Sequence, residues 1–179
     1  GCKHILLGIG GSATNDAGVG MLQALGFRFL NKEGEEIGDG GSCLSQITQV
    51  DSSRILPQLK TCIIEVATDV KNPFYGENGA ACIFAPQKGA NQEQVQQLDQ
   101  GLRSFAQLIQ DEMGLDIQSV AGAGAAGGLG GGCVAFLNAR LISGIDQVKA
   151  CVNFDSIIQD ADLIITGEGK VDQQTSQGK

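Results

Sequence analysis

Acidic side chains stand directly after three apolar runs of this sequence. Asp16 follows the first run, Asp69 follows the second, and Glu168 and Asp172 follow the last. If the runs are parallel strands, their carboxyl ends meet at one edge of the sheet, where ligands bind in open α/β folds. Carboxylates gathered there could hold Mg²⁺ and deprotonate a hydroxyl group, as phosphoryl transfer requires. For Asp69, an Asx-turn or a helix cap is an equally good local interpretation.

The segment 6–20, LLGIGGSATNDAGVG, runs from an apolar strand into a glycine-rich turn. Gly10 and Gly11 allow the backbone to approach a ligand closely, and Ser12 or Thr14 can cap the helix that follows. Free N–H groups at a helix start point toward an anion such as a phosphate or a carboxylate. The segment lacks the Gly-Lys-Ser/Thr sequence of a P-loop, so a nucleotide here would be held differently.

A second glycine-rich stretch, GAGAAGGLGGG at 122–132, leads into the apolar segment 133–137. It is again a glycine loop that opens a helix, and two such loops in one domain favour a cleft that cradles phosphate. Lys88 lies on a loop between Pro86 and Gly89, where its ammonium group could meet a phosphate. An exposed lysine is, however, usually only solvated.

The same glycines also permit a dinucleotide-binding interpretation. Gly8, Gly10 and Ala13 match a dinucleotide fingerprint after a strand, and Glu33 lies near the distance expected for a ribose-binding acid. The segment 27–37, however, is more typical of a hairpin than of a strand that ends at a ribose.

A second fingerprint, at Gly122, Gly124 and Gly127, follows only a poor strand candidate. Asn15 and its polar neighbours supply chemistry that a dinucleotide turn does not need, which favours the phosphate-type loop. Tight packing of helix against strand alone could also explain the glycines.

Apolar runs near 4–9, 62–68 and 162–166 predict strands, and the continuous first run is typical of a buried parallel strand. Because helices separate these runs, we expect an α/β fold with a mainly parallel sheet flanked by helices. The hairpin leaves a mixed sheet open. His4 would lie at the end of the first strand opposite the cleft, so we interpret it as structural.

Residues 91–113 form the clearest predicted helix. Apolar side chains recur there every three or four positions, and Asn91 with Gln94 approximates a capping box. Shorter helices are predicted near 78–85, 146–152 and 156–159, besides those that follow the two glycine loops.

The composition is that of a globular protein with an acidic balance. The 179 residues carry a net charge of −8 and contain no basic run. This argues against nucleic acid or an anionic membrane as a partner. The six cysteines form no C-x-x-C pair, which makes a zinc site unfavourable. We interpret them as reduced thiols of a cytoplasmic protein.

Five motifs, in this order and spacing, resemble bacterial glycerate kinases of the first type: LLGIGGSATNDAGVGMLQALG, ATDVKNP, APQKGA, GAGAAGG and ADLIITGEGKVDQQT. The resemblance spans nearly the whole chain. It implies phosphorylation of D-glycerate by ATP with Mg²⁺, on the 2-hydroxyl group. It also implies a two-domain α/β protein whose active site lies between the domains, with the oligomeric state unknown.

The resemblance, together with the residues themselves, gives a set of candidate site residues. Asp16 and Asp69 are the candidate catalytic carboxylates, and Asp69 and Glu168 are the candidate metal ligands. The candidate substrate and phosphate contacts are Gly10, Gly11, Ser12, Thr14, Asn15, Lys88, Gly122, Gly124, Gly127, Glu168 and Asp172. Two residues depart from the family: Lys71 replaces a usually acidic residue, and Lys170 replaces arginine.

The chain is about half the usual length of the family, so we expect residues 1–179 to be a single α/β domain of a larger kinase. An isolated, non-catalytic ligand-binding domain is therefore a second hypothesis. An NAD(P)-dependent oxidoreductase built on the two fingerprints is a third.

Overall fold

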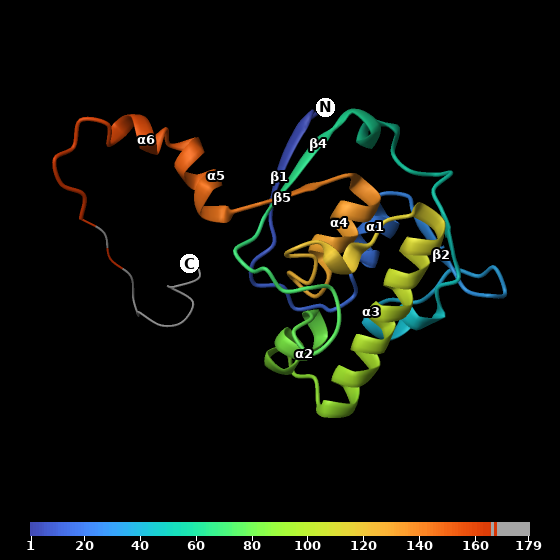
Figure 1. The fold of residues 1–179 in the computed structure, drawn as a ribbon. Helices are drawn as coiled ribbons and strands as arrows, with labels where there is room; N and C mark the ends of the chain where they lie inside the picture. Colours follow the sequence, from blue (N-terminus) through green and yellow to red (C-terminus); the bar gives the residue numbers. More distant parts are fainter. Residues whose placement is uncertain (166, 168–179) are drawn as a thin grey trace.

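The computed structural model describes residues 1–165 and 167, and it is an α/β fold (Figure 1). Three strands, β1 (His4–Gly8), β4 (Ile63–Ala67) and β5 (Arg140–Ile142), form a parallel sheet in the order β1-β4-β5. Because the strands are parallel and in register, Gly8 pairs with Ala67 and Ala67 with Ile142. All three carboxyl ends therefore lie at the same edge, which confirms the predicted parallel arrangement.

The predicted hairpin is present, but it belongs to a different sheet. After β2 (Arg28–Leu30) the chain turns at Asn31, whose side chain accepts two N–H groups of the turn. The returning segment donates from the N–H of Ile37 to the carbonyl of Phe29. β2 pairs with β3 (Gln49–Asp51) as a separate antiparallel sheet, so within the described residues the main sheet contains parallel strands alone.

The long helix α3 (Gln92–Met113) has the predicted bounds to within one residue. Asn91 and Gln94 form the predicted capping box, with both hydrogen bonds at 2.9 Å, and Gly114 ends the helix at φ 69°. The other helices are α1 (Val19–Ala24), α2 (Ala80–Phe84), α4 (Leu129–Leu137), α5 (Gly144–Cys151) and α6 (Phe154–Ile157). The 3₁₀ helices are η1 (Gly41–Gln46), η2 (Pro57–Thr61), η3 (Pro86–Lys88) and η4 (Ile117–Ser119).

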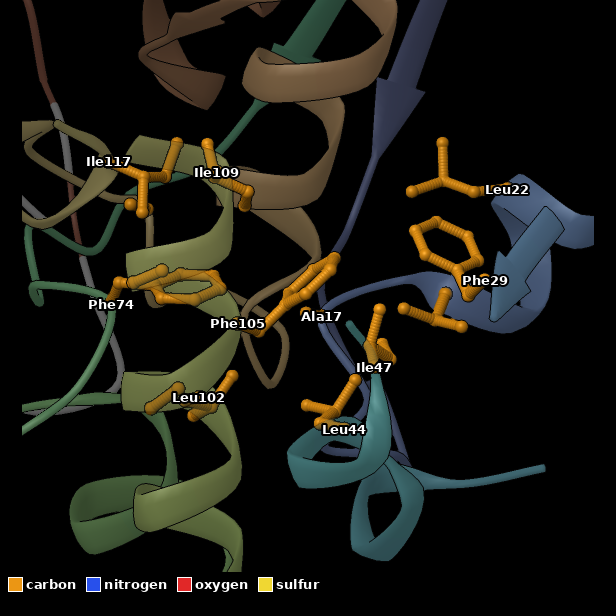
Figure 2. Close-up of a cluster of buried hydrophobic side chains, with 14 of the residues drawn as sticks. Ala17, Leu22, Phe29, Leu44, Ile47, Phe74, Leu102, Phe105, Ile109 and Ile117 are labelled. Carbon is orange, nitrogen blue, oxygen red and sulfur yellow. The ribbon is translucent and has the colours of Figure 1, made fainter. Parts of the chain in front are cut away.

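The main hydrophobic core lies between α3 and the first third of the chain. Figure 2 shows Phe105 of α3 close to Phe29 of β2 and to Ala17 at the end of the first glycine loop. The Phe29 and Phe105 rings meet edge to face, with centroids 5.7 Å apart, and Phe136 of α4 stacks on Phe105. These contacts between aromatic rings add specific geometry to the burial of apolar area. They fix α3, β2 and α4 around the first glycine loop.

The main sheet is covered mostly on one face. Ile64 and Val66 of β4 pack against Cys133 of α4 in a second, smaller core. On β1, Leu6 is 46% exposed, and Ile63 at the start of β4 is 50% exposed. The prediction that the first strand is buried is therefore wrong: within the described residues, β1 is an edge strand with a neighbour on one side only. His4, at its amino end, bonds to Glu65 with 2.7 Å between Nε2 and Oε2.

The third strand of the sheet is not the predicted one. Residues 163–165 form no strand, and Leu163 and Ile165 are 77% and 88% exposed. A strand needs a hydrogen-bonded neighbour, and these residues have none among the described part of the chain. They follow α5 and α6, which extend away from the rest of the molecule (Figure 1). No helix in the described part of the chain is long and apolar enough to cross a membrane.

Candidate functional site

A cleft of about 330 Å³ lies at the carboxyl edge of the main sheet. Its walls come from residues 9–12 after β1, residues 67–70 at the end of β4, Lys88 of η3, and residues 125–126 of the second glycine loop. Segments that are far apart in sequence thus meet where two neighbouring parallel strands end. This is the position expected for a ligand site in an open α/β sheet.

Gly10 and Gly11 leave the backbone of the first loop open to the cleft. A Cβ atom built on either glycine would meet no other atom within 4 Å. Gly11 has a φ of +70°, which favours glycine. Within the described residues, the N–H groups of Gly10, Gly11 and Ser12 donate no hydrogen bond to the protein. Unpaired N–H groups beside empty space are suited to bind an anion.

Lys88 reaches the first loop from the opposite wall. Its Nζ donates to Ser12 Oγ at 2.8 Å and to the carbonyl oxygen of Thr14 at 2.5 Å. Partial burial lowers the pKa of the Lys88 ammonium group below its usual value, and the negative charge of Asp16 acts in the opposite direction. The structure therefore brings together three predicted site residues, Ser12, Thr14 and Lys88.

Asp69 lies between the cleft and the start of α5. Its Oδ1 accepts the N–H of Gly144 at 3.0 Å, and Ser143 is the N-cap of the same helix. One carboxylate oxygen therefore contacts the start of a helix that is distant in sequence, and not a helix that Asp69 caps locally. The second oxygen accepts no hydrogen bond from the described residues. Asp69 also lines a neighbouring cavity of about 470 Å³, whose wall includes Lys71.

Asp16 holds the start of α1. Its two carboxylate oxygens accept from the N–H groups of Gly18, at 3.1 Å, and Gly20, at 3.3 Å. The prediction that Ser12 or Thr14 caps this helix is wrong, because the helix begins only at Val19, after a turn in which Ala17 has a φ of 55°. Asp16 is not among the residues that line the cleft, and its catalytic role stays a prediction.

Asn15 is buried below the loop, with 7% of its surface exposed. Neither its Nδ2 nor its Oδ1 atom has a hydrogen-bond partner among the described residues. An unpaired buried amide is uncommon and calls for an explanation. Asn15 is not among the residues that line the cleft, and its predicted ligand contact stays a prediction.

The second glycine loop packs against the backbone. A Cβ atom on Gly124 would lie under 3.0 Å from the carbonyl of Pro73, and one on Gly127 would lie equally close to the backbone of Thr14. The N–H of Ala17 donates to the carbonyl of Gly127 at 3.0 Å, which joins the two loops. Gly122, with a φ of +86°, faces the carbonyl of Val70. A phosphate contact by these three glycines stays a prediction.

The remaining predicted residues, Glu168, Lys170 and Asp172, lie outside the described residues. In the described part of the chain, no three His, Cys, Asp or Glu side chains gather closely enough to hold a metal ion. A single carboxylate is nevertheless compatible with Mg²⁺, which often binds one or two protein carboxylates and completes its shell with water and phosphate. The free oxygen of Asp69 at the cleft fits that requirement.

Several residues of the site were not anticipated. Gln87, Ala125 and Ala126 line the cleft, and Gly144 contacts Asp69. Gln87 belongs to the APQKGA motif, so its position beside Lys88 was a usable signal. Gly144 lies 75 positions from Asp69, and local sequence gives no sign of that contact.

The whole chain is similar to known proteins of one family. The model of the glycerate kinase family matches residues 1–179. The chain is 50% identical over 179 residues to a glycerate kinase of Halalkalibacterium halodurans and 48% identical to a glycerate 2-kinase of Escherichia coli. All of this chain aligns with each, but it spans just under half of their length, 47% in both cases.

A solved structure is similar in fold as well as in sequence. The crystal structure described as "putative glycerate kinase 2" from Salmonella typhimurium LT2 superposes with a TM-score of 0.87 at 46% identity. The match covers 98% of this chain and 47% of that one.

Proposed function

Because the chain belongs to the glycerate kinase family, we propose that it carries the nucleotide-phosphate part of a site at which ATP phosphorylates the 2-hydroxyl group of D-glycerate. The cleft at the carboxyl edge of the sheet is the observation that supports this proposal most. It combines open glycine N–H groups, a lysine and a carboxylate with one free oxygen. Residues 1–179 would be one domain of a larger kinase.

Different residues of the cleft would serve different requirements of a phosphoryl transfer. The N–H groups of Gly10, Gly11 and Ser12 would bind phosphate oxygens, since they have no partner among the described residues and the space at the Cβ positions of the two glycines is open. The Lys88 ammonium group extends from the opposite wall to Ser12 of this loop, and its positive charge favours a polyanion there.

Asp69 would act at the other wall. Its free oxygen would hold Mg²⁺ together with Glu168, or accept the proton of the glycerate hydroxyl group. Bound Mg²⁺ would neutralise charge on the phosphates of the nucleotide. The hydrogen bond from Gly144 keeps the carboxylate oriented. Asp16 would support the site by fixing the turn that leads to α1.

The oxidoreductase hypothesis has weaker structural support. In a dinucleotide site the glycine fingerprint opens directly into a helix, whereas α1 begins at Val19, six residues after Ala13. Glu33 lies in the tight turn of the hairpin and not at the end of a strand. We also propose a cytoplasmic location, because all six cysteines are free thiols, as expected in a reducing compartment.

An assay of ADP release tests the proposal. The isolated chain is compared with a chimera in which these 179 residues replace the matching segment of the H. halodurans glycerate kinase. With ATP, Mg²⁺ and D-glycerate, we expect the chimera to be active and Asp69→Asn to lower kcat at least about 100-fold. Glu112→Gln, an exposed change on α3, is the matched control.

The isolated chain separates the first two hypotheses. If it binds ATP but releases no ADP, the non-catalytic binding domain is correct for this segment alone. Full activity of the Asp69→Asn chimera would remove Asp69 from the chemistry. A folded chain that is stabilised by NAD(P) and not by ATP would refute the kinase proposal, because only a ligand that binds the native state raises its stability.

A further inference from the structure

Lys88 stands on an unusually well-fixed turn between α2 and α3. Pro86 is the first residue of η3, and Gly89 ends it at φ 97°. The N–H groups of Lys88, Gly89 and Ala90 all donate to carbonyls of this turn, at 3.0 to 3.1 Å. The capping box of α3 follows immediately. The Cα atom of Lys88 is therefore held in place from both sides before any ligand arrives.

The ammonium group uses two of its three N–H donors on the first glycine loop. One goes to Ser12 Oγ and one to the carbonyl of Thr14. The loop is packed by the second glycine loop, but it has few other hydrogen bonds: in the described part of the chain, the N–H groups of residues 10–16 donate no backbone hydrogen bond. Lys88 is thus its main polar attachment to the opposite wall.

The bond to Ser12 also determines what the hydroxyl group can do. An ammonium group has no lone pair, so Ser12 Oγ can only accept from it, and the hydroxyl proton must point elsewhere. Ser12 lines the cleft, and within the described residues its hydroxyl donates to no protein group. The proton is consequently available to an acceptor in the cleft.

We propose that Lys88 is a positioning residue that holds residues 10–16 against η3 and directs the Ser12 hydroxyl group as a hydrogen-bond donor to a phosphate oxygen in the cleft. The inference rests on the proposed function for the identity of the ligand. It differs from the simpler view in which Lys88 itself is the main phosphate contact.

The surroundings of the lysine agree with a fixed internal contact. Partial burial lowers the pKa of the Lys88 ammonium group, so its position costs solvation that an exposed lysine would keep. The Asp16 carboxylate acts against that shift and favours the charged form. Two hydrogen bonds to the loop compensate for part of the lost water contacts.

A double-mutant cycle on the 179-residue chain tests how Lys88 acts. The probe is inorganic tripolyphosphate, titrated by calorimetry at pH 7.5 into wild type, Lys88→Met, Ser12→Ala and the double variant. If Lys88 acts through Ser12, each single change weakens binding about 10-fold, and the double variant is weaker by little more than either. If the double variant instead binds tripolyphosphate about 100-fold more weakly than the wild type, the two changes act independently. Lys88 would then bind phosphate directly, which would overturn the proposal.

A second measurement needs no ligand. In ¹⁵N relaxation experiments on the free chain, we expect the backbone order parameters of Gly11 and Thr14 to fall from about 0.85 toward 0.6 in Lys88→Met. Lys88→Arg, which keeps the charge and the donors, should restore both order and affinity. Lys60→Met, an exposed lysine on η2, is the matched control.

The two measurements separate the two proposals. If the wild-type chain does not bind tripolyphosphate, the proposed phosphate site fails and the donor role of Ser12 fails with it. The order parameters still decide whether Lys88 holds the loop. Unchanged order in Lys88→Met would refute that role even if phosphate binds.

Discussion

The two glycine-rich loops have similar compositions but opposite surroundings. In the first, the Cβ positions of Gly10 and Gly11 face empty space at the cleft. In the second, those of Gly124 and Gly127 are already occupied by the backbone of other segments. In the first loop, the lack of a side chain lets a ligand approach the backbone. In the second loop, it lets two segments of main chain pack closely against each other.

This difference explains how the cleft is built. The second loop packs on the backbone at Thr14 and accepts the N–H of Ala17, so it supports the first loop from behind. Lys88, on the opposite wall of the cleft, donates a hydrogen bond to the carbonyl of Thr14 in the same loop. The open glycines can stay open because the packed glycines and the lysine fix the chain around them. Changes in the two loops should therefore affect different properties.

The largest effect is expected from Gly127→Ala. The new methyl group would lie under 3.0 Å from the backbone of Thr14, at a residue whose φ is +71°. We expect the free energy of unfolding to fall by about 3 kcal/mol, because overpacking and backbone strain act together. Urea denaturation measures the loss. Gly10→Ala is the control and should change stability by no more than about 0.5 kcal/mol; equal losses would contradict the comparison.

The rate at which the buried Cys133 thiol is modified should also depend on how tightly α4 is packed. Burial raises the pKa of the Cys133 thiol from 9.0 to about 11, so its thiolate at pH 8 is about 100-fold scarcer than that of an ordinary thiol. In mass-spectrometric mapping of alkylation at pH 8, Cys133 should therefore react at least about 100-fold more slowly than the exposed Cys151. Gly127→Ala should loosen the packing and so reduce the difference between the alkylation rates of Cys133 and Cys151. Equal rates in the wild-type chain would show that α4 is not packed as described.

The smallest change is expected from Gly10→Ala, and it should affect binding alone. A methyl group in the open space would obstruct an anion that approaches the N–H groups of the loop. We expect the affinity for tripolyphosphate to fall about 10-fold, or about 1.4 kcal/mol. Gly8→Ala, an equally open position that does not line the cleft, is the matched control. An unchanged affinity in Gly10→Ala would place the phosphate elsewhere.

Much of the scaffold could be predicted because its signals are local. The α3 helix carries a regular apolar stripe, a capping box and a terminal glycine, and its bounds were predicted to within one residue. The parallel strands β1 and β4 followed from their apolar runs. β5 has only three residues and begins with Arg140, so local sequence does not distinguish it from a loop. The apolar run at 163–165 has a strong strand pattern, but the described residues offer it no neighbour.

The site was predictable in its location and less so in its contacts. The motifs correctly brought Ser12, Asp69 and Lys88 to one cleft. Their hydrogen bonds depend on residues far away in sequence, such as Gly144 for Asp69 and Gly127 for the first loop. Sequence patterns also do not distinguish a glycine that is open to a ligand from one that is filled by backbone, because that depends on tertiary packing.

The hydrogen bond between Asp69 and Gly144 links the cleft to a helix that lies 75 positions away in sequence. A cation bound to the Asp69 carboxylate would weaken the attraction of this group for the positive amino end of α5. By thermodynamic reciprocity, a partner that displaces the start of α5 would strengthen cation binding at Asp69. The position of the α5–α6 segment (Figure 1) and the occupancy of the cleft would thus be coupled through one hydrogen bond.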